Sequence, residues 1–185
     1  ATVSPETLTF TPANYGTTQE VTVTGINDND IDGHEEYEIS LSAADQLTDD
    51  PEVDTLAGAA GSSATTDGTG TSARFTKPND ITSDGTNLYV SQNNHTIRKI
   101  VISTGVVSTF AGSGSTGSAD GTGTSATFNE PAGITTDGTN LYVGDQNNHT
   151  IRKVVISSGV VTTLAGSAGN TGSTDDTGTA ARFNT

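Results

Sequence analysis

Residues 78–112 read PNDITSDGTNLYVSQNNHTIRKIVISTGVVSTFAG, and residues 131–166 read PAGITTDGTNLYVGDQNNHTIRKVVISSGVVTTLAG. With one residue inserted in the second copy, 27 of 35 aligned pairs are identical. His95 and His149 lie 54 residues apart, and the ends of the two copies show nearly the same spacing. Self-similarity at a fixed period is the sequence signature of a repeat architecture and outranks local propensity. The chain is therefore expected to be built from repeated units.

A shorter motif recurs between the long copies. It reads DGTGTSARF at 67–75, DGTGTSATF at 120–128 and DDTGTAARF at 175–183. Because each occurrence ends in phenylalanine, we expect an ordered loop in which Phe75, Phe128 and Phe183 are anchored between repeats. A flexible Gly/Ser tether is the alternative. TLAG at 55–58 matches the end of a long copy and is expected to be the last strand of a preceding, otherwise missing copy.

Each long copy reads as four short strands. In the first copy they are expected at 81–83, 88–91, 96–102 and 106–111. Alternation in the third strand puts Ile97 and Lys99 on one face and Arg98 and Ile100 on the other. Four short strands at a period of 40 to 50 residues or slightly more are typical of a propeller blade. The predicted fold class is all-β, with a partial β-propeller of four-stranded blades.

The repeats resemble NHL propeller blades. The family's D-x-x-N-H-x-I-R pattern is matched by Asp145, Asn148, His149, Ile151 and Arg152. The first copy departs from the pattern, because Gln92 follows Ser91 directly and the aspartate is missing. The resemblance covers about residues 55–185, with two complete blades at 78–112 and 131–166 and partial copies at both ends. It implies a stack of blades, which closes into a ring at about 4–8 blades.

The octapeptide QNNHTIRK, at 92–99 and 146–153, carries the residue types that often do chemistry. It falls between the second and third strands, away from the first strand that lines a propeller channel. One histidine per blade cannot share an ion with the next, and zinc needs several ligands at about 2 Å. We therefore predict a structural role, in which Asn side chains satisfy the turn, His bonds its neighbour, and Arg98 or Arg152 reaches a carboxylate or carbonyl.

Enzymatic function is not expected from these repeats. NHL propellers include lyases, such as the peptidylglycine amidating lyase, but their central-metal ligands on inner strands are not matched here. There is no cysteine, no Gly-x-Ser-x-Gly elbow and no phosphate-binding loop. We predict no catalytic and no cofactor-binding residue. The alternatives are a fragment of a propeller lyase or lactonase, or a glycan- or peptide-binding propeller, whose site lies on missing blades.

The negative charge is concentrated at the start of the chain. Residues 1–54 contain 13 acidic and no basic residues, out of a net charge of −15 for the whole chain. This asymmetry marks a boundary near Asp54. It also argues against nucleic acid as a partner, because phosphate binding needs a basic patch. No run of about 18 apolar residues predicts a transmembrane helix.

The first segment shows alternating apolar and polar residues. The pattern predicts three antiparallel strands, near Leu8–Phe10, Val21–Val23 and Ile39–Leu41. LTFTPANYGTTQEVTVTGINDND resembles the C-terminal half of a Calx-β domain, over about residues 2–43. The resemblance implies a partial β-sandwich at 1–44, followed by an acidic linker at 45–54 and the blades at 55–185.

The Calx-β resemblance also implies a calcium site, because such domains bind calcium with loop carboxylates. The candidate ligands are Asp28, Asp30, Asp32, Glu35 and Glu36. An EF-hand is excluded, because the twelfth position of that loop is Ile39 where the motif needs Glu. A solvated acidic hairpin loop is the alternative.

The predicted function is structural. The variant of the repeat with the DGTGTSARF motif resembles long arrays in exported bacterial proteins, which implies an extracellular or cell-surface location. A four-stranded blade cannot bury both faces alone, and open strand edges favour association. We therefore expect adhesion or fibre formation through β contacts between chains, by self-association or with other copies of the repeat.

Overall fold

The computed structural model describes residues 2–4, 22–24 and 53–184. The chain divides into two compact units, Ala1–Asp50 and Pro51–Thr185. In the first unit, β1 (Thr2–Ser4) pairs antiparallel with β2 (Thr22–Thr24). A strand was expected near β2. The other strands of the predicted half-sandwich and the candidate calcium ligands between 28 and 36 lie outside the described residues.

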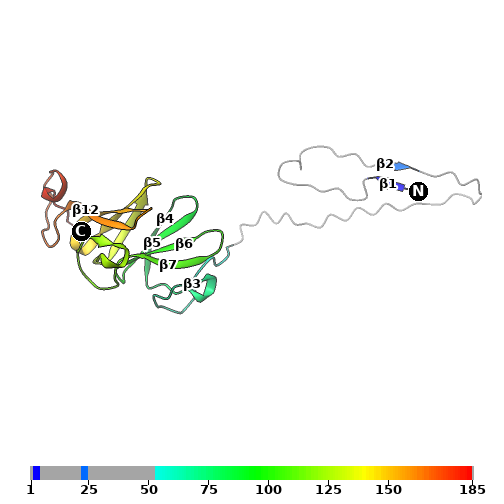
Figure 1. The fold of residues 1–185 in the computed structure, drawn as a ribbon, viewed down its shortest axis with the longest axis horizontal. Helices are drawn as coiled ribbons and strands as arrows, with labels where there is room; N and C mark the ends of the chain where they lie inside the picture. Colours follow the sequence, from blue (N-terminus) through cyan, green and yellow to red (C-terminus); the bar gives the residue numbers. More distant parts are fainter. Residues whose placement is uncertain (1, 5–21, 25–52, 185) are drawn as a thin grey trace, which may run out of the picture. The chain divides into compact units, whose positions relative to one another are not determined.

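Two five-stranded antiparallel sheets make up the described part of the second unit (Figure 1). Sheet 1 has the order β3-β7-β6-β5-β4, with β3 (Gly68–Thr69), β4 (Pro78–Ser83), β5 (Asn87–Gln92), β6 (Thr96–Val101) and β7 (Val106–Ala111). Sheet 2 has the order β8-β12-β11-β10-β9, with β8 (Gly121–Thr122), β9 (Pro131–Thr136), β10 (Asn140–Asp145), β11 (Thr150–Val155) and β12 (Val160–Gly166). Each long copy therefore forms one sheet.

The short motif adds a fifth strand to each sheet, where the sequence predicted four. Gly68 and Thr69 pair with β7, and Gly121 and Thr122 pair with β12. A 3₁₀ turn follows the motif's first residues in all three copies: η1 (Gly70–Ser72), η2 (Gly123–Ser125) and η4 (Gly178–Ala180). The ordered loop is confirmed. The extra strand was missed because two residues are too few to show alternation. We call residues 66–75, 119–128 and 174–183 clamps 1, 2 and 3.

Residues 55–58 do not form the strand that their sequence predicted. The amide of Gly58 donates to the Gly70 carbonyl, as the amide of Gly112 donates to the Gly123 carbonyl at the end of β7. The local loop contact is thus retained. A strand needs a partner strand for its ladder, and none of the described residues pairs with 55–58 in a sheet.

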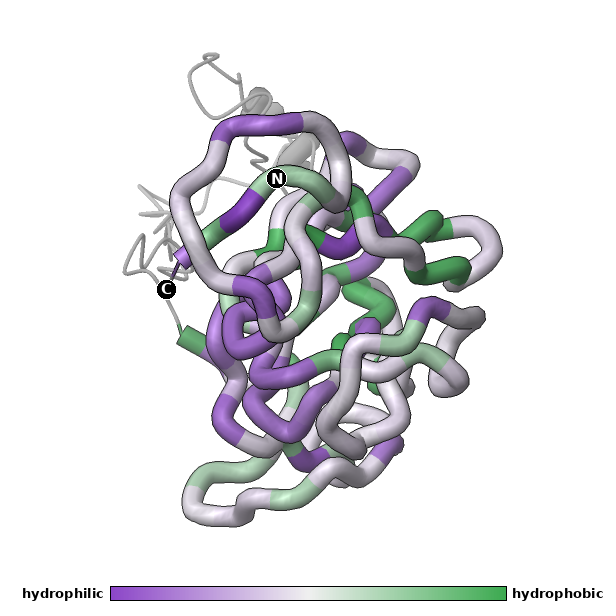
Figure 2. The backbone as a smooth tube through the Cα atoms, turned by 90° about the vertical axis from the view of Figure 1, so that its left-hand side faces the viewer, coloured by the Kyte–Doolittle hydropathy of each residue, from purple (hydrophilic) through white to green (hydrophobic). Residues whose placement is uncertain are grey.

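The main hydrophobic core lies between the two sheets. It joins Tyr89, Ile97 and Ala111 of sheet 1 to Ala126 and Phe128 of clamp 2 and to Ile134, Leu141, Val143, Val154 and Val161 of sheet 2. A smaller cluster lies on the other side of sheet 1, with Val90, Ile100, Val107 and Ala73. Figure 2 shows hydrophobic and hydrophilic stretches alternating along the backbone. Burying each large apolar side chain contributes about 1.5–3 kcal/mol, so stacking holds the sheets together.

The repeated DGTN turns are held by their aspartate. Asp84 Oδ1 accepts hydrogen bonds from the amides of Thr86 at 2.9 Å and Asn87 at 2.6 Å. Its Oδ2 accepts one from the Tyr89 hydroxyl at 3.0 Å. Burial raises the pKa of Asp84, but these hydrogen bonds outweigh it and lower the pKa from 3.8 to about 2. Asp137 makes the same set of bonds in sheet 2.

We expect the stability that Asp84 contributes to be lost as the pH falls from 3.8 towards 2. The folded-state pKa lies below the unfolded one, so the carboxylate stabilises the fold fully above the unfolded value and not below the folded one. Asp84→Asn keeps an acceptor oxygen but does not titrate. Urea unfolding across this range should show the gap between wild type and variant shrinking as the pH falls. A gap that does not change with pH would contradict the assignment.

Candidate functional site

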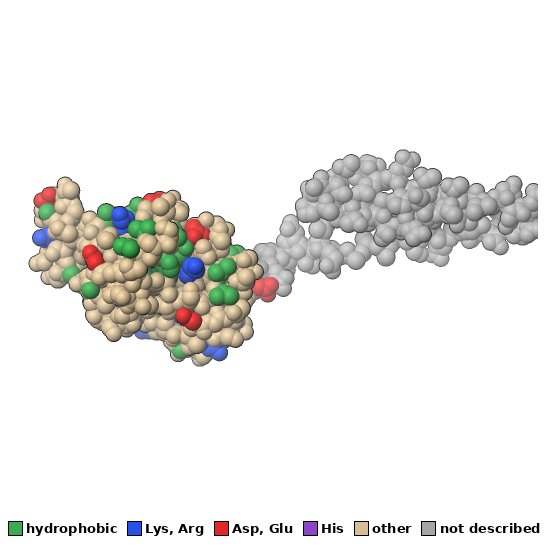
Figure 3. Space-filling view, in the orientation of Figure 1, with side chains coloured by type: hydrophobic (Ala, Val, Ile, Leu, Met, Phe, Trp, Pro, Cys, Tyr) green, Lys and Arg blue, Asp and Glu red, His purple; other side chains and the backbone are tan. Residues whose placement is uncertain are grey.

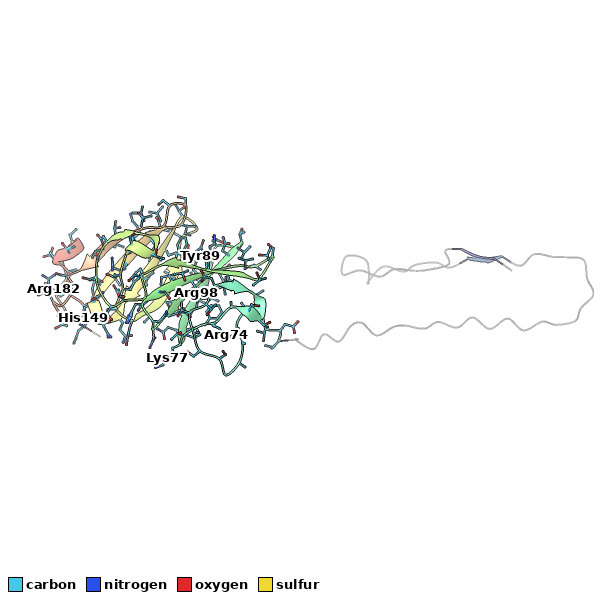
Figure 4. All side chains as sticks on the ribbon, turned by 60° about the horizontal axis from the view of Figure 1, so that its bottom comes forward. Arg74, Lys77, Tyr89, Arg98, His149 and Arg182 are labelled. Carbon is cyan, nitrogen blue, oxygen red and sulfur yellow. The ribbon has the colours of Figure 1, made fainter. Side chains whose placement is uncertain are left out.

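Arg98 is fully buried beneath clamp 1, in the interior of sheet 1 (Figure 4). Its Nη2 donates to Asp67 Oδ1 at 2.8 Å and to the Thr66 carbonyl at 3.1 Å. Its Nη1 donates to the Arg74 carbonyl at 2.9 Å. The guanidinium carbon lies 5.3 Å from the centre of the Phe75 ring, within cation–π range. Burial lowers the pKa of Arg98, and Asp67 opposes that shift. Arg98 therefore fastens clamp 1 to its sheet.

Arg152 repeats this arrangement under clamp 2 and gains a second carboxylate. It donates to Asp120 Oδ1 at 2.8 Å and to the carbonyls of Thr127 and Ala119 at 3.0 and 3.1 Å. Arg152 Nη1 also donates to Asp145 Oδ2 at 3.0 Å, and both of these side chains are fully buried. The prediction that the repeated arginine reaches a carboxylate or carbonyl is confirmed. Its role in these contacts is structural.

The strand register shows which residue replaces Asp145 in sheet 1. Gln92 ends β5 at the register position where Asp145 ends β10. Gln146 is therefore the inserted residue, although the sequence alignment paired it with Gln92. Gln92 Oε1 accepts from Arg98 Nη1 at 3.5 Å, while Gln92 Nε2 is buried without a hydrogen-bond partner. Sheet 1 thus has a neutral amide where sheet 2 has a buried carboxylate.

His95 binds the segment that leads into the next sheet. Its backbone is left-handed, with φ 66°. His95 Nδ1 accepts from the Glu130 amide at 3.1 Å, and Nε2 lies 3.1 Å from Thr116 Oγ1. The sequence predicted a bond to a neighbour, and the structure finds these partners 35 and 21 residues away. His149 has a similar backbone, and Figure 4 places it towards the end of this unit that also holds Arg182.

Strands β4 and β5 of sheet 1 are joined to β9 of sheet 2 by polar contacts. Asn79 Nδ2 donates to the Pro131 carbonyl at 2.9 Å, Ser91 Oγ donates to the Ala132 carbonyl, and Asp80 Oδ2 accepts from the Ile134 amide at 2.9 Å. In sheet 2, the positions of Asn79, Asp80 and Ser91 are taken by Ala132, Gly133 and Gly144. Sheet 2 therefore lacks these polar groups on the side that faces away from sheet 1.

Sheet 1 leaves one face unstacked within this unit. We call the face of a sheet that carries Tyr89 and Ile97, or Tyr142 and Ile151, its front face. The opposite face, which carries Ile81 and Leu88 or Ile134 and Leu141, is its back face. The front face of sheet 1 covers the back face of sheet 2, so Ile134 is only 6% exposed, whereas Ile81 on the back face of sheet 1 is 53% exposed.

The front face of sheet 2 is the second unstacked face. Tyr142 and Ile151 are partly exposed there, whereas Tyr89 and Ile97 are buried against sheet 2. A shallow hollow of about 450 Å³ opens on this face, lined by Tyr142, Gly144 and Ile151 among others. Hydrophobic side chains also reach the surface in several places in the view of Figure 3. The candidate functional site is this pair of faces together with the clamps.

The carboxylates that bind Arg98 and Arg152 were not predicted from the sequence. Asp67 and Asp120 belong to the short motif and lie 31 and 32 residues before Arg98 and Arg152. That recurrent spacing was a signal that could have paired them. Within 53–184 and the two short strands, no three His, Cys, Asp or Glu residues are grouped so as to hold a metal. None of the helices in these parts is long and apolar enough to cross a bilayer.

Among known proteins, those with similar sequences contain NHL repeats. No protein-family profile matches the chain. NHL repeat-containing protein 2 of Homo sapiens is 36% identical over 104 residues, which are 53% of this chain and 14% of that protein. The same protein of Bos taurus is 40% identical over 92 residues, 46% and 13% of the two chains. This chain therefore spans less than one sixth of the curated relatives it matches.

A solved structure supports the fold. An auxiliary nutrient binding protein from Bacteroides ovatus superposes with a TM-score of 0.51 at 22% identity, covering 62% of this chain and 32% of that one. At this identity the likeness concerns the fold alone. The described repeats are all-β units of five-stranded antiparallel sheets, and their sequence is similar to part of an NHL repeat-containing protein.

Proposed function

We propose that this chain is a non-enzymatic structural module of the cell exterior, used for adhesion or fibre building, which acts through β contacts between chains. The observation that carries the proposal is the pair of unstacked sheet faces. Ile81 is 53% exposed, although the same position of sheet 2 is covered by a neighbouring sheet. Exposed apolar surface of this kind often marks a site of protein–protein contact. Here the same surface is buried in sheet 2 and exposed in sheet 1.

The contact between sheets 1 and 2 supports this proposal, because it serves as the pattern for the contact between chains. It combines an apolar centre with polar bonds from Asn79, Asp80 and Ser91 at one side and His95 at the turn. A partner of matching chemistry is another sheet of the same repeat. The extracellular location of the module remains part of the proposal, supported by the sequence resemblance, and fractionation of the source cells tests it.

Calcium binding by Asp28, Asp30, Asp32, Glu35 and Glu36 is a further part of this proposal. It is supported by the sequence pattern of the loop, since calcium takes six to eight oxygen ligands and carboxylates are preferred. Calorimetry with calcium, before and after chelation, tests it. Absence of heat and of any shift in melting temperature would remove calcium from the proposal.

We expect the wild-type chain to associate as its concentration rises, and Ile81→Lys to weaken that association. A charge on the back face of sheet 1 would have to be buried without a partner. Val106→Lys is the matched control, because Val106 is also exposed, at 42%, and its equivalent Val160 stays 36% exposed although sheet 1 covers sheet 2. Sedimentation velocity measures the mass of each species. A wild-type chain that stays monomeric at every concentration would overturn the proposed function.

A further inference from the structure

We propose that clamp 3 is a docking arm for sheet 1 of a second copy of this chain. The copies join head to tail, with the front face of sheet 2 of one copy against the back face of sheet 1 of the next. Clamp 3 then holds Arg98 of the next copy in place of that copy's own clamp 1. This inference rests on the proposed function and names the partner and the contact.

Clamp 3 already has the clamp conformation. DDTGTAARF at 175–183 is identical to DGTGTSARF at 67–75 in seven of nine positions. In clamp 3 the Ala181 amide donates to the Gly178 carbonyl at 3.3 Å, and the Arg182 amide donates to the Thr174 carbonyl at 3.0 Å. The corresponding bonds of clamp 1 run from Ala73 to Gly70 and from Arg74 to Thr66. The arm is therefore pre-organised, which lowers the cost of binding.

The binding groups of clamp 3 lack the arginine that the other clamps hold. Asp120 of clamp 2 pairs with Arg152, whereas Asp175 of clamp 3 makes no ion pair among the described residues. Phe128 of clamp 2 is fully buried, but Phe183 is 37% exposed. Clamp 3 is seated on its preceding sheet as clamp 2 is, with the phenylalanine ring against the glycine that ends the last strand. Among the described residues, no sheet is stacked on clamp 3 as sheet 2 is on clamp 2.

A second copy fits because the interface inside the chain can repeat between chains. The back face of sheet 1 has the same apolar pattern as the back face of sheet 2, with the pairs Ile81/Ile134, Leu88/Leu141, Val90/Val143, Ile100/Val154 and Val107/Val161. The front faces match through Tyr89/Tyr142 and Ile97/Ile151. Such a contact joins two different surfaces, so it is heterologous and extends into a ring or a fibre.

Exchange of clamps resolves the competition for Arg98. In the described chain, Arg98 is held by Asp67 and Phe75. Clamp 3 of the neighbouring copy has Asp175 and Phe183 at the positions of Asp67 and Phe75 in the motif. Arg98 would therefore lose one ion pair and one cation–π contact and gain another of each. Exchange of identical elements is a low-cost route to assembly. Burial of the two open faces then supplies the driving force.

One position of clamp 3 fits less well. Asp176 stands where clamp 1 has Gly68, and a Cβ at Gly68 would lie 3.3 Å from backbone atoms of Ser72 and Ala73. Crowding there opposes the short edge strand that Gly68 forms with β7. Asp176→Gly should therefore strengthen the head-to-tail contact.

Cysteine cross-linking tests the arrangement, because the chain contains no cysteine. Asp80 bonds to Ile134 across the two sheets inside the chain, and the equivalent pair between copies is Gly133 with Ile81. Gly133→Cys and Ile81→Cys are prepared as separate full-length chains, and both positions are exposed. Under mild oxidation we expect disulfide dimers from the mixture, at least about tenfold above either chain alone, since a heterologous contact pairs different surfaces.

The outcomes separate this inference from the proposed function. Disulfide dimers that form equally well within one variant would show a symmetric contact and overturn the head-to-tail arrangement. No mixed disulfide in a chain that still associates would also overturn it, while leaving the proposed function in place. A wild-type chain that is monomeric throughout would overturn both.

Clamp exchange has a separate test. Phe183→Ala should raise the dissociation constant of the wild-type assembly by about tenfold or more, because a buried aromatic anchor is lost. Asp176→Gly should lower the dissociation constant, and Val106→Ala, which removes an exposed side chain outside the contact, should leave it unchanged. Sedimentation equilibrium measures all three. An unchanged dissociation constant for Phe183→Ala would show that clamp 3 takes no part in the contact.

Discussion

Arg152→Met is expected to lower the free energy of unfolding by about 3–5 kcal/mol, the range for breaking a buried ion pair by removing one partner. Asp145 would then be left as an unpaired carboxylate with no exposed surface. The carbonyls of Thr127 and Ala119 would lose a donor as well. Urea unfolding followed by circular dichroism measures the change.

Arg98→Met is the matched control, because it makes the same substitution in the other repeat. Its cost should be smaller, about 1–3 kcal/mol, the range for leaving buried polar groups unsatisfied. Gln92 is neutral, and Asp67 is 54% exposed and can be hydrated. In sheet 2, the double variant Arg152→Met/Asp145→Leu should recover part of the loss, since no charge remains buried. Equal losses at Arg98 and Arg152 would contradict the role given to Asp145.

Gly112→Ala is expected to lower the free energy of unfolding by about 3 kcal/mol, of which roughly 1–2 kcal/mol comes from the left-handed backbone. Gly112 has φ 92°. A Cβ there would press on the carbonyl oxygen of His95 and lie 3.1 Å from the Phe128 ring. Because the carbonyl belongs to the turn that starts β6, the backbone must shift to make room, and overpacking of that kind is costly.

Gly138→Ala separates the steric part from the conformational part. Gly138 has φ 86°, close to that of Gly112, but a Cβ there would meet nothing within 4 Å. Its cost should therefore be limited to about 1–2 kcal/mol for the left-handed backbone. Thermal and urea unfolding of both variants give the comparison. If the two substitutions cost the same, the contact between clamp 2 and the end of β7 is not as tight as the structure shows.

The two sheets show how a repeat that is nearly identical in sequence acquires different roles by position. The back face of sheet 2 is core against sheet 1, whereas the same face of sheet 1 leaves Ile81 53% exposed and has only clamp 1 over Val90 and Ile100. The front face of sheet 1 is buried against sheet 2, whereas the front face of sheet 2 is partly exposed. Substitutions at corresponding positions, such as Ile81 and Ile134, are therefore expected to differ in kind: the first should change association, and the second should change folding.

The repeat, the four main strands of each long copy and their two faces could be predicted from the sequence alone. The fourth strand, expected at 106–111, is β7 (Val106–Ala111), and Arg98 lies on the opposite face from Ile97. These properties were predictable because a strand's alternation is local and because two copies confirm each other. The structural role of the repeated arginine also followed, since a cation in an alternating apolar strand must find an acceptor.

Features that depend on contacts between distant segments became visible in the folded structure alone. The edge strand at Gly68–Thr69, the exchange of Asp145 for Gln92, and the bond from Glu130 to His95 join residues more than 30 apart or depend on strand register. The identical residues of the two copies could not reveal these features. Aligning them also placed the inserted residue at Asp145, one position before Gln146. QNNHTIRK looks the same in both copies, but what each copy touches is set by the segment folded against it, because burial and hydrogen bonding are properties of the packed chain.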